Sequence, residues 1–292
     1  MSSIRTIGFI GYGAMASLMG RNLIQAGHDV VAYTPSGRSN GAEADVPMLA
    51  SPRLVAEKSD AIILCVPNDE AENRTLHGED GLLAGLRHSQ LVLDTSTVSP
   101  EQADHLAALL KERGVAVLDT PMSGSTPEAE KGALIMLVGG PEDTVERARP
   151  ILDCIGRITI HAGPAGSAAR LKLVVNGIMG GTLNIIAEGI AYGLASGVER
   201  DVLFDALQEL AVISPHHKRK IGMGQERNFP SQFPTRLMSK DMGLLLEAGR
   251  RCGVPMHGMA AASQNLAFSS RHHADDDYSA LIAQMEQNIA NR

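Results

Sequence analysis

A glycine-rich turn between a buried strand and an amphipathic helix constrains this chain most. Residues 4–10 are mostly apolar and predict a strand, which runs directly into Gly11-Tyr12-Gly13-Ala14-Met15-Ala16. In this G-x-G-x-x-A pattern the first glycine permits a tight turn, the second lets the backbone approach a pyrophosphate, and the alanine keeps the next helix close to the sheet. The helix predicted over 14–26 directs free N–H groups at the phosphates. The pattern predicts a dinucleotide site formed by Gly11, Tyr12, Gly13, Ala14 and Met15.

The end of the second predicted strand, residues 29–33, bears on which nicotinamide cofactor binds. NAD-selective sites usually place Asp or Glu there to hold the ribose hydroxyls. This chain has no carboxylate at that point, and its side chains there include Thr34, Ser36 and Arg38. Hydroxyls and a guanidinium suit a 2′-phosphate, because Arg forms charge-assisted, bidentate bonds to phosphate. We expect NADP, held by these three residues; the alternative, that Arg38 is a solvated loop charge, leaves NAD possible.

Strand and helix patterns continue to alternate through the first half of the chain. Further apolar strands are predicted over 61–66, 91–94, 115–119 and 134–138, with a helix over 100–113. This alternation is typical of a doubly wound parallel sheet of the Rossmann kind. Ligands of such sheets bind beyond the carboxyl ends of the strands. That rule selects the loops 66–68, 94–97 and 119–125, and with them Val66, Pro67, Asn68 and Thr97 as candidate cofactor contacts.

Beyond Gly163 the strand patterns stop and the sequence predicts helices only. We therefore expect a cofactor domain over 1–162 and an all-helical substrate and dimerisation domain over 163–292. The segment 171–194 is apolar on nearly every face, but its asparagines, Glu188 and its glycines disfavour a membrane span. A helix apolar all round is normally buried by other helices. A domain of about 120 residues would enclose it poorly, so we expect a homodimer or homotetramer, with Tyr192 in the core.

A lysine and an asparagine stand one helical turn apart at the start of this apolar segment. Lys172 and Asn176 would share one face of the helix. Burial removes hydration from an ammonium group and lowers its pKa toward neutrality, so Lys172 could exchange a proton at physiological pH. Asn176 could hold a substrate oxygen beside it. The pair is the candidate catalytic site, against the alternative that the lysine extends to solvent.

Composition agrees with a soluble enzyme of two domains. The 292 residues are 44% hydrophobic and 20% charged, with a net charge of −7 and few aromatics, which disfavours a nucleic-acid surface. The N-terminal segment lacks the pattern of a signal peptide. Three cysteines, an odd number in apolar settings, indicate reduced core thiols. We expect a cytoplasmic protein that associates with neither nucleic acid nor membrane.

Two histidine pairs and one basic run are interpreted as structural. His216 and His217 are adjacent and would point about 100° apart on a helix, which disfavours a shared metal. His272 and His273 precede the acidic run 275–277, which we interpret as a solvated loop and helix cap. We expect no metal, and we interpret the basic run 218–220 as a solvated helix face.

The whole chain resembles the β-hydroxyacid dehydrogenase family, which includes 3-hydroxyisobutyrate dehydrogenase and the tartronate, glyoxylate and succinic semialdehyde reductases. Four blocks match in order, at residues 11–16, 119–127, 163–176 and 240–249. Four ordered matches are much more specific than any one alone. The resemblance implies a Rossmann domain followed by an all-α domain built around a long helix.

The resemblance also assigns roles to single residues. It makes Lys172 the catalytic acid or base and Asn176 its hydrogen-bonding companion. It places Ser123, Gly124 and Ser125 in the loop that holds the substrate carboxylate. Lys240, followed by Asp241, matches the second lysine of the family, beside nicotinamide and substrate; Thr97 matches the nicotinamide-ribose contact and Pro67 the cofactor crevice.

The implied reaction is hydride transfer between nicotinamide and the carbonyl carbon of a short semialdehyde or 2-oxoacid, with Lys172 supplying the proton. Where the family often has Gly-Gly after the loop serine, this chain has Gly124 and Ser125, and Met122 replaces the usual valine. The strand-end Asn-Arg-Thr of many NADP-using relatives is replaced by residues 34–36. These departures affect the substrate and the phosphate contact.

Two alternative functions are kept. Imine reductases resemble this family in fold and cofactor but generally lack the catalytic lysine, so Lys172 disfavours that function. A non-catalytic NADP-binding protein would retain the fold, but both lysines and the anion loop are intact.

Overall fold

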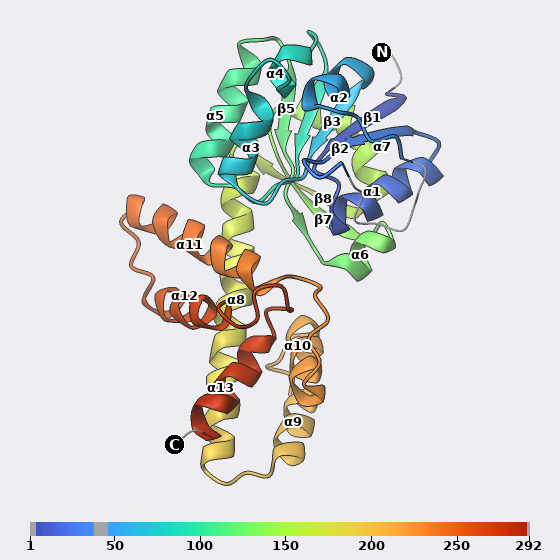
Figure 1. The fold of residues 1–292 in the computed structure, drawn as a ribbon. Coiled ribbons are helices and arrows are strands. Elements are labelled where there is room, and N and C mark those ends of the chain that lie inside the picture. The colour runs from blue at the N-terminus through green and yellow to red at the C-terminus, as the bar shows by residue number, and fades with distance from the viewer. Residues whose placement is uncertain (1–3, 38–45, 291–292) are drawn as a thin grey trace. The chain divides into compact units, whose positions relative to one another are not determined.

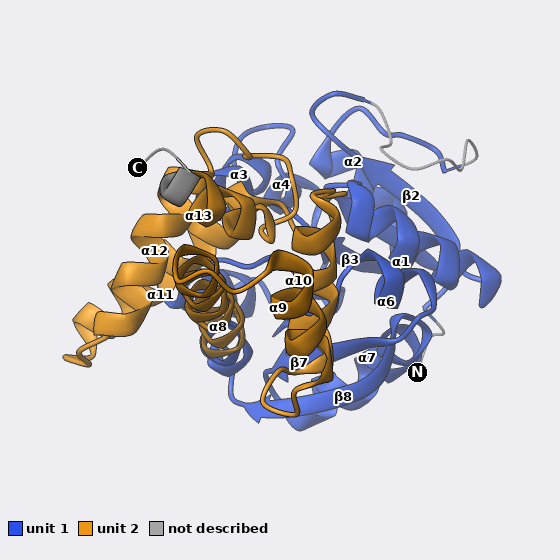
Figure 2. Ribbon diagram, turned by 90° about the horizontal axis from the view of Figure 1, so that it is seen from below, with its two compact units in different colours: residues 1–172 blue, residues 173–292 orange. Residues whose placement is uncertain are grey.

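The computed structural model describes residues 4–37 and 46–290. Arg38, one of the predicted phosphate contacts, lies outside the described residues. The chain forms two compact units, residues 1–172 and residues 173–292 (Figure 2). The first unit combines a sheet with helices, and the elements of the second, within its described residues, are all helices (Figure 1). This confirms the predicted class, a Rossmann-type α/β fold followed by an all-α part with a long helix.

The sheet of the first unit has eight strands in the order β2-β1-β3-β4-β5-β7-β6, with β8 paired to β7. The first five strands are parallel to one another, as the alternating pattern predicts. The strands are β1 (Thr6–Ile10), β2 (Asp29–Tyr33), β3 (Ala61–Leu64), β4 (Leu91–Asp94), β5 (Ala116–Asp119), β6 (Met122–Ser123), β7 (Leu134–Gly139) and β8 (Gly156–Gly163).

Two details of the predicted sheet need correction. Strand β7 runs antiparallel to β5 and β6, so the sheet is not parallel throughout. Between β5 and β7 the chain forms the short strand β6, which itself pairs antiparallel with β7, and the five-residue helix α6, in place of the helical crossover of a βαβ unit. Strand β6, inside the predicted loop 119–125, and strand β8 were not predicted. The exposed positions of β8 alternate poorly with buried ones, so its sequence carries a weak strand signal.

Helices cover both faces of the sheet because alternate strand residues point to opposite sides. On β3, Ala61 and Ile63 pack in one core cluster with residues of α1 and α7, whereas Ile62 and Leu64 pack in the other with residues of α2 and α5. The helices of this unit are α1 (Ala14–Gln25), α2 (Pro52–Lys58), α3 (Asp69–Leu76), α4 (Leu82–Gly85), α5 (Pro100–Lys111), α6 (Thr126–Glu130) and α7 (Glu142–Ile155). Strands buried on both faces explain the fully apolar runs in the sequence.

The parallel strands bring their carboxyl ends to one edge of the sheet. Main-chain hydrogen bonds continue the ladder just past the strand ends, from the Cys65 N–H to the Ile10 carbonyl and from the Thr95 N–H to the Leu64 carbonyl, each over 2.9 Å. The loops that follow β1, β3, β4 and β5 therefore leave the sheet together. The candidate site residues in these loops therefore lie along this edge of the sheet.

The long helix α8 (Ser167–Ala195) begins in the first unit and continues through the second. The second unit also contains α9 (Arg200–Glu209), α10 (Pro215–Glu226), α11 (Thr235–Arg251), α12 (His257–Ser269) and α13 (Ala280–Ala290). Among the described residues, α8 alone is long and apolar enough to cross a membrane, with a mean hydropathy of 1.4 over a stretch that is 56% buried inside the protein. Leu183, Ala187 and Ile190 of α8 pack in the core of this unit, so one side of α8 is buried as in a core helix.

Apolar side chains are exposed along one face of α8 in the part of the chain that the structure describes. Val174, Ile178, Ile185 and Tyr192 are all exposed and repeat at intervals of four and seven residues, which places them along one stripe. Tyr192 is 76% exposed, so its predicted place in the core is wrong. Helical spacing alone identifies a shared face, but it does not tell which faces the neighbouring helices cover.

A buried ion pair ties α10 to the segment before α13. The Lys220 ammonium lies 2.8 Å from Asp277, and the two side chains are 1% and 0% exposed. The same carboxylate accepts the backbone N–H groups of Gln232 and Phe233, and the ammonium lies 5.1 Å from the Tyr278 ring centre. The interpretation of Lys220 as part of a solvated face, and of Asp277 as part of a solvated loop, is therefore wrong.

Replacing Lys220 by methionine is expected to lower the free energy of unfolding by about 3–5 kcal/mol, because it leaves a buried carboxylate without its counter-charge. Urea unfolding monitored by circular dichroism measures this loss. Arg236→Met, which removes the exposed pair of Arg236 with Asp275, is the matched control and is expected to change stability little. Equal, small effects of both substitutions would contradict the importance of the buried pair.

Candidate active site

The turn between β1 and α1 has the geometry that a pyrophosphate requires. Gly11 has φ +86°, and a Cβ there would lie 2.2 Å from the Cys65 carbonyl oxygen, so only glycine fits. At Gly13 a Cβ would meet nothing within 4 Å, so the space beside this backbone is open. Gly13 also provides no side-chain cap for α1. The first-turn N–H groups can therefore face an anion, and the residues present fit a dinucleotide.

The other residues of this turn differ in what they can contribute. The Tyr12 side chain is 3% exposed and packs edge-on against Phe9, with the ring centres 5.3 Å apart. A Cβ at Gly20 would lie 2.3 Å from the Tyr12 hydroxyl oxygen, so the ring fills a space beside α1. Tyr12 can therefore contribute to a cofactor site only through its backbone. Ala14 is exposed and Met15 half-buried at the start of α1.

The end of β2 presents two hydroxyl groups close together. The Oγ atoms of Thr34 and Ser36 lie 3.3 Å apart in an exposed turn. The Gly11 N–H donates to the Tyr33 carbonyl over 2.9 Å, which joins the end of β2 to the glycine turn. The structure therefore brings these two predicted contacts together beside the glycine turn.

The loops after β3 and β4 are fastened to each other. The Val66 N–H donates to Ser96 Oγ over 3.1 Å, and the Ser99 N–H donates to Asp69 over 3.0 Å. Asn68 caps α3 by accepting the Ala71 N–H. The side-chain carbonyl of Asn68 is therefore engaged within the protein. Pro67 is exposed and Thr97 is half-buried. The loops 66–68 and 95–97 form one connected rim.

Two buried carboxyl groups lie beneath this rim. Glu72 of α3 is fully buried, and its Oε1 accepts a hydrogen bond of 2.8 Å from the Gln102 amide. Asp94, at the end of β4, accepts the Ser96 N–H over 3.0 Å. Burial raises the pKa of Glu72, and the nearby Asp94 raises it further. Burial also raises the pKa of Asp94. The pair therefore retains a proton at pH values where a solvated carboxyl group has lost its own.

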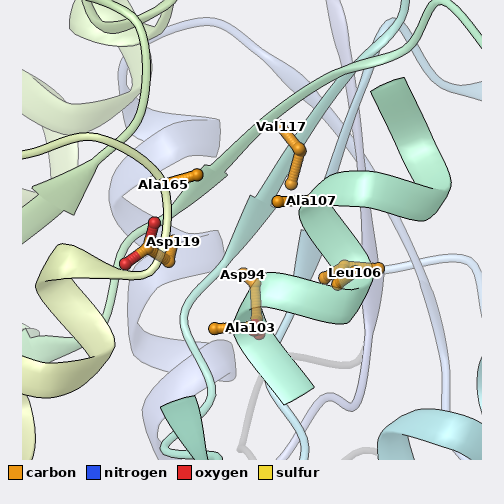
Figure 3. A pocket seen from close by; sticks show the side chains of 7 residues that line it. All are labelled: Asp94, Ala103, Leu106, Ala107, Val117, Asp119 and Ala165. Atoms are coloured by element: carbon orange, nitrogen blue, oxygen red, sulfur yellow. The ribbon is translucent and has the colours of Figure 1, made fainter. Parts of the chain in front are cut away.

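A small pocket opens between α5 and the end of β5. Its volume of about 10 Å³ is at the lower limit for one water molecule. Figure 3 shows Asp94 and Asp119 among otherwise apolar walls, with Asp119 beside Ala165. The pocket is too small for an organic substrate and does not mark the catalytic site.

The predicted anion loop, residues 123–125, offers fewer donors than the sequence indicates. Ser123 is half-buried, and Gly124 is exposed with φ +131°. Ser125 donates both its backbone N–H and its hydroxyl to Glu128, over 2.8 and 2.9 Å, in a capping box at the start of α6. The Ser125 donors are therefore used inside the protein. The Ser123 hydroxyl and the Gly124 backbone N–H are the better candidates for a substrate carboxylate.

Lys172 and Asn176 both belong to α8, one turn apart, as predicted. Lys172 is 8% exposed and Asn176 is 0% exposed. The Asn176 amide nitrogen donates to Asp241 over 2.6 Å. Its amide oxygen is buried without a hydrogen-bond donor among the described residues, so it is available to accept a hydrogen bond from a bound molecule.

Lys240 completes a charged group in the second unit. Its ammonium lies 2.9 Å from Asp241, which is 2% exposed. The structure therefore brings Asn176, Lys240 and Asp241 together through contacts between α8 and α11. Asp241 orients the Asn176 amide and balances the charge of Lys240, a role that the sequence pattern alone did not assign.

Glu128 was missed in the sequence although a signal for it was present. The spacing Ser125-x-x-Glu128 is the capping-box pattern.

The histidine pairs have structural contacts: His216 bonds to the Tyr278 hydroxyl over 2.6 Å, and His273 bonds to Asp276 over 2.8 Å. In the described part of the chain, no group of three or more His, Cys, Asp or Glu side chains could hold a metal. Cys65, Cys154 and Cys252 are free thiols.

The glycine turn, the mostly parallel sheet and the helical unit agree with the class of nicotinamide-dependent oxidoreductases, and the family matches assign the chain to it. Residues 6–163 match the family described as the NAD-binding domain of 6-phosphogluconate dehydrogenase. Residues 166–285 match the family described as the NAD-binding part of NADP-dependent 3-hydroxyisobutyrate dehydrogenase. The chain belongs to the β-hydroxyacid dehydrogenase family and is an NAD(P)-dependent dehydrogenase or reductase.

Individual relatives agree with this assignment. The chain is 31% identical to the NAD-dependent L-serine dehydrogenase of Pseudomonas aeruginosa, covering 95% of this chain and 97% of that protein. It is also 31% identical to the chloroplastic glyoxylate/succinic semialdehyde reductase 2 of Arabidopsis thaliana, covering 95% of this chain and 78% of that protein. The solved structure of Mycobacterium tuberculosis 3-hydroxyisobutyrate dehydrogenase with L-serine is 29% identical, with a TM-score of 0.85 over 97% of this chain and 99% of that one.

Replacing Glu72 by glutamine is expected to stabilise the protein at alkaline pH. The pKa of Glu72 is raised in the folded state, so its stability contribution is present below the unfolded pKa and is lost as pH rises through the folded one. Glutamine keeps the acceptor for Gln102 and removes this loss. At pH 8, thermal unfolding should show a higher Tm for Glu72→Gln than for wild type, corresponding to a free energy of unfolding larger by about 1–3 kcal/mol. At pH 5 the difference should be smaller. A difference that stays constant with pH would contradict the raised pKa.

Proposed function

We propose that this enzyme reduces a short semialdehyde or 2-oxoacid that carries a carboxylate, with NADPH as the preferred cofactor. A bound nicotinamide would supply the hydride, or accept it in the reverse direction. Lys172 gives a proton to the substrate oxygen as negative charge develops there, and in oxidation the neutral lysine removes the hydroxyl proton. The observation that carries the proposal is a buried lysine one helical turn from a buried amide with a free acceptor.

The surrounding residues have complementary roles in this proposal. Asn176, oriented by Asp241, accepts a hydrogen bond beside the reacting oxygen. Ser123 and Gly124 hold the substrate carboxylate with a hydroxyl and a backbone N–H. Lys240 adds a positive charge for the anionic substrate, and its pairing with Asp241 fixes where that charge lies.

The cofactor contacts follow from the glycine turn and the rim of loops. Gly11, Gly13 and the start of α1, with Ala14 and Met15, hold the pyrophosphate. Thr34, Ser36 and Arg38 bind the 2′-phosphate. The residues proposed to border the nicotinamide half are Val66, Pro67, Asn68, Thr97 and Lys240.

We also propose a homodimer or homotetramer in the cytoplasm. The exposed stripe of Val174, Ile178, Ile185 and Tyr192 on α8 supports association, because contiguous exposed apolar surface is costly in water. The domain ranges 1–162 for the cofactor and 163–292 for substrate and association are part of the same proposal.

Lys172→Ala is expected to lower kcat by about 10²–10⁴-fold, the usual value of general acid–base catalysis, with little change in the KM for NADPH. Steady-state oxidation of NADPH should be measured with glyoxylate, succinic, tartronate and methylmalonate semialdehydes and a cyclic imine. Lys111→Ala, which removes an exposed lysine of the same unit, is the matched control. Turnover of the imine alone, or aldehyde turnover indifferent to Lys172, would contradict the proposal and favour an imine reductase. Cofactor binding without any turnover would favour a non-catalytic protein.

Wild-type enzyme is expected to have a higher kcat/KM with NADPH than with NADH. Arg38→Ala should raise the KM for NADPH by about 10–100-fold, the value of a charge-assisted hydrogen bond, and leave the KM for NADH nearly unchanged. Arg157→Ala, an exposed arginine elsewhere in the unit, serves as control. A preference for NADH that Arg38→Ala does not alter would show that the 2′-phosphate is not recognised.

A further inference from the structure

Asp119, the last residue of β5, holds the first turn of α8 with both carboxylate oxygens. Its Oδ1 accepts the Gly166 N–H over 2.8 Å and its Oδ2 accepts the Ala169 N–H over 2.9 Å. The donors stand 47 and 50 residues further along the chain. The carboxylate is 6% exposed, so water does not replace these bonds easily. A side chain from the sheet thus satisfies two N–H groups that a helix start leaves without partners.

The Asp119 carboxylate occupies space beside a glycine of the neighbouring strand. Gly139 of β7 is paired with Asp119 across the sheet. A Cβ at Gly139 would lie 2.4 and 2.6 Å from the two carboxylate oxygens, closer than any such contact allows. The absence of a side chain at Gly139 therefore permits the position of Asp119. Gly139→Ala would displace the carboxylate without removing it.

The same helical turn is held from a second side by α5. Ala169 packs in a small buried cluster with Val98 and Ala103. Arg170 donates to both oxygens of Asp104, over 3.1 and 2.7 Å. This pair is about half exposed and contributes little. The buried bonds to Asp119 are therefore the main polar attachment of this turn to the sheet.

Lys172 follows Ala169 by three residues, so the two lie about one turn apart on α8. The direction in which a helical side chain leaves the helix is set by the backbone of its own turn. Fixing the Ala169 N–H therefore fixes the origin and direction of the Lys172 side chain. Misplacing a reacting group by about 1 Å can cost about 10²-fold in rate.

We propose that Asp119 is a positioning residue for Lys172, acting by holding the start of α8 in register with the end of β5. The inference rests on the proposed acid–base role of Lys172. Asparagine at position 119 keeps one acceptor oxygen and loses the other, and alanine loses both. We expect kcat to fall about tenfold in Asp119→Asn and about 100-fold in Asp119→Ala, with the KM for NADPH nearly unchanged.

A double-mutant cycle between positions 119 and 172 separates positioning from general destabilisation. If Asp119 acts through Lys172, Asp119→Asn lowers kcat in the wild-type background and has no further effect in Lys172→Ala. Gly139→Ala is expected to behave as Asp119→Asn does, which keeps the test valid if Asp119→Ala fails to fold. Ser51→Ala removes the side-chain cap of α2 in the same unit and is the matched control, expected to lower Tm and leave kcat unchanged.

Equal kcat losses from Asp119→Asn in both backgrounds, or a wild-type kcat in Asp119→Asn and Gly139→Ala, would overturn the positioning role and leave the function of Lys172 intact. A wild-type kcat in Lys172→Ala would overturn the proposed function itself. The two failures are thus distinguishable.

Discussion

The two hydrogen bonds from Gly166 and Ala169 to Asp119 fasten the start of α8 to the sheet, and our proposal for Lys172 depends on them. They join the carboxyl end of a central strand to the helix that carries Lys172. The strand end is itself fixed, because β5 pairs with β4 and, at Asp119, with β7. A charge-assisted bond to a buried carboxylate is stronger and more directional than an apolar contact. A rigid sheet thus gives a flexible lysine side chain a defined origin.

The parallel arrangement explains why the other candidates of this unit lie along the same edge. Strands β1, β3, β4 and β5 end at the same edge of the sheet, and a hydrogen bond from the Val66 N–H to Ser96 Oγ joins the loops that follow β3 and β4. The buried carboxyl groups of Glu72 and Asp94 lie beneath this rim, and burial raises the pKa of each. The same edge therefore combines backbone donors for phosphates with the start of the helix that carries Lys172.

Much of the fold could be predicted from the sequence because strands buried on both faces and an amphipathic helix after Gly13 give strong periodic signals. The antiparallel direction of β7 could not, since it depends on pairing with β6 and β5 that the periodic pattern of β7 does not show. Lys220 was misjudged for a related reason. A run of three basic residues looks solvated, and the partner that buries Lys220 is Asp277, 57 residues away. Local pattern carries no information about such distant partners.

The candidate site also combines features that the sequence predicts with features that depend on distant partners. The order of the motifs made Lys172, Asn176, Ser123 and Lys240 candidates, yet the use of the Ser125 donors by Glu128, and of the Asn176 amide by Asp241, depends on side-chain geometry.

The most direct test of the proposed reaction is a single-turnover reduction at saturating cofactor, in wild type and in Lys172→Ala, with NADPH that carries deuterium at both C4 positions. We expect deuterium on the carbon that bears the new hydroxyl group and a much slower turnover in the variant. Equal single-turnover rates, or no deuterium on that carbon, would contradict it.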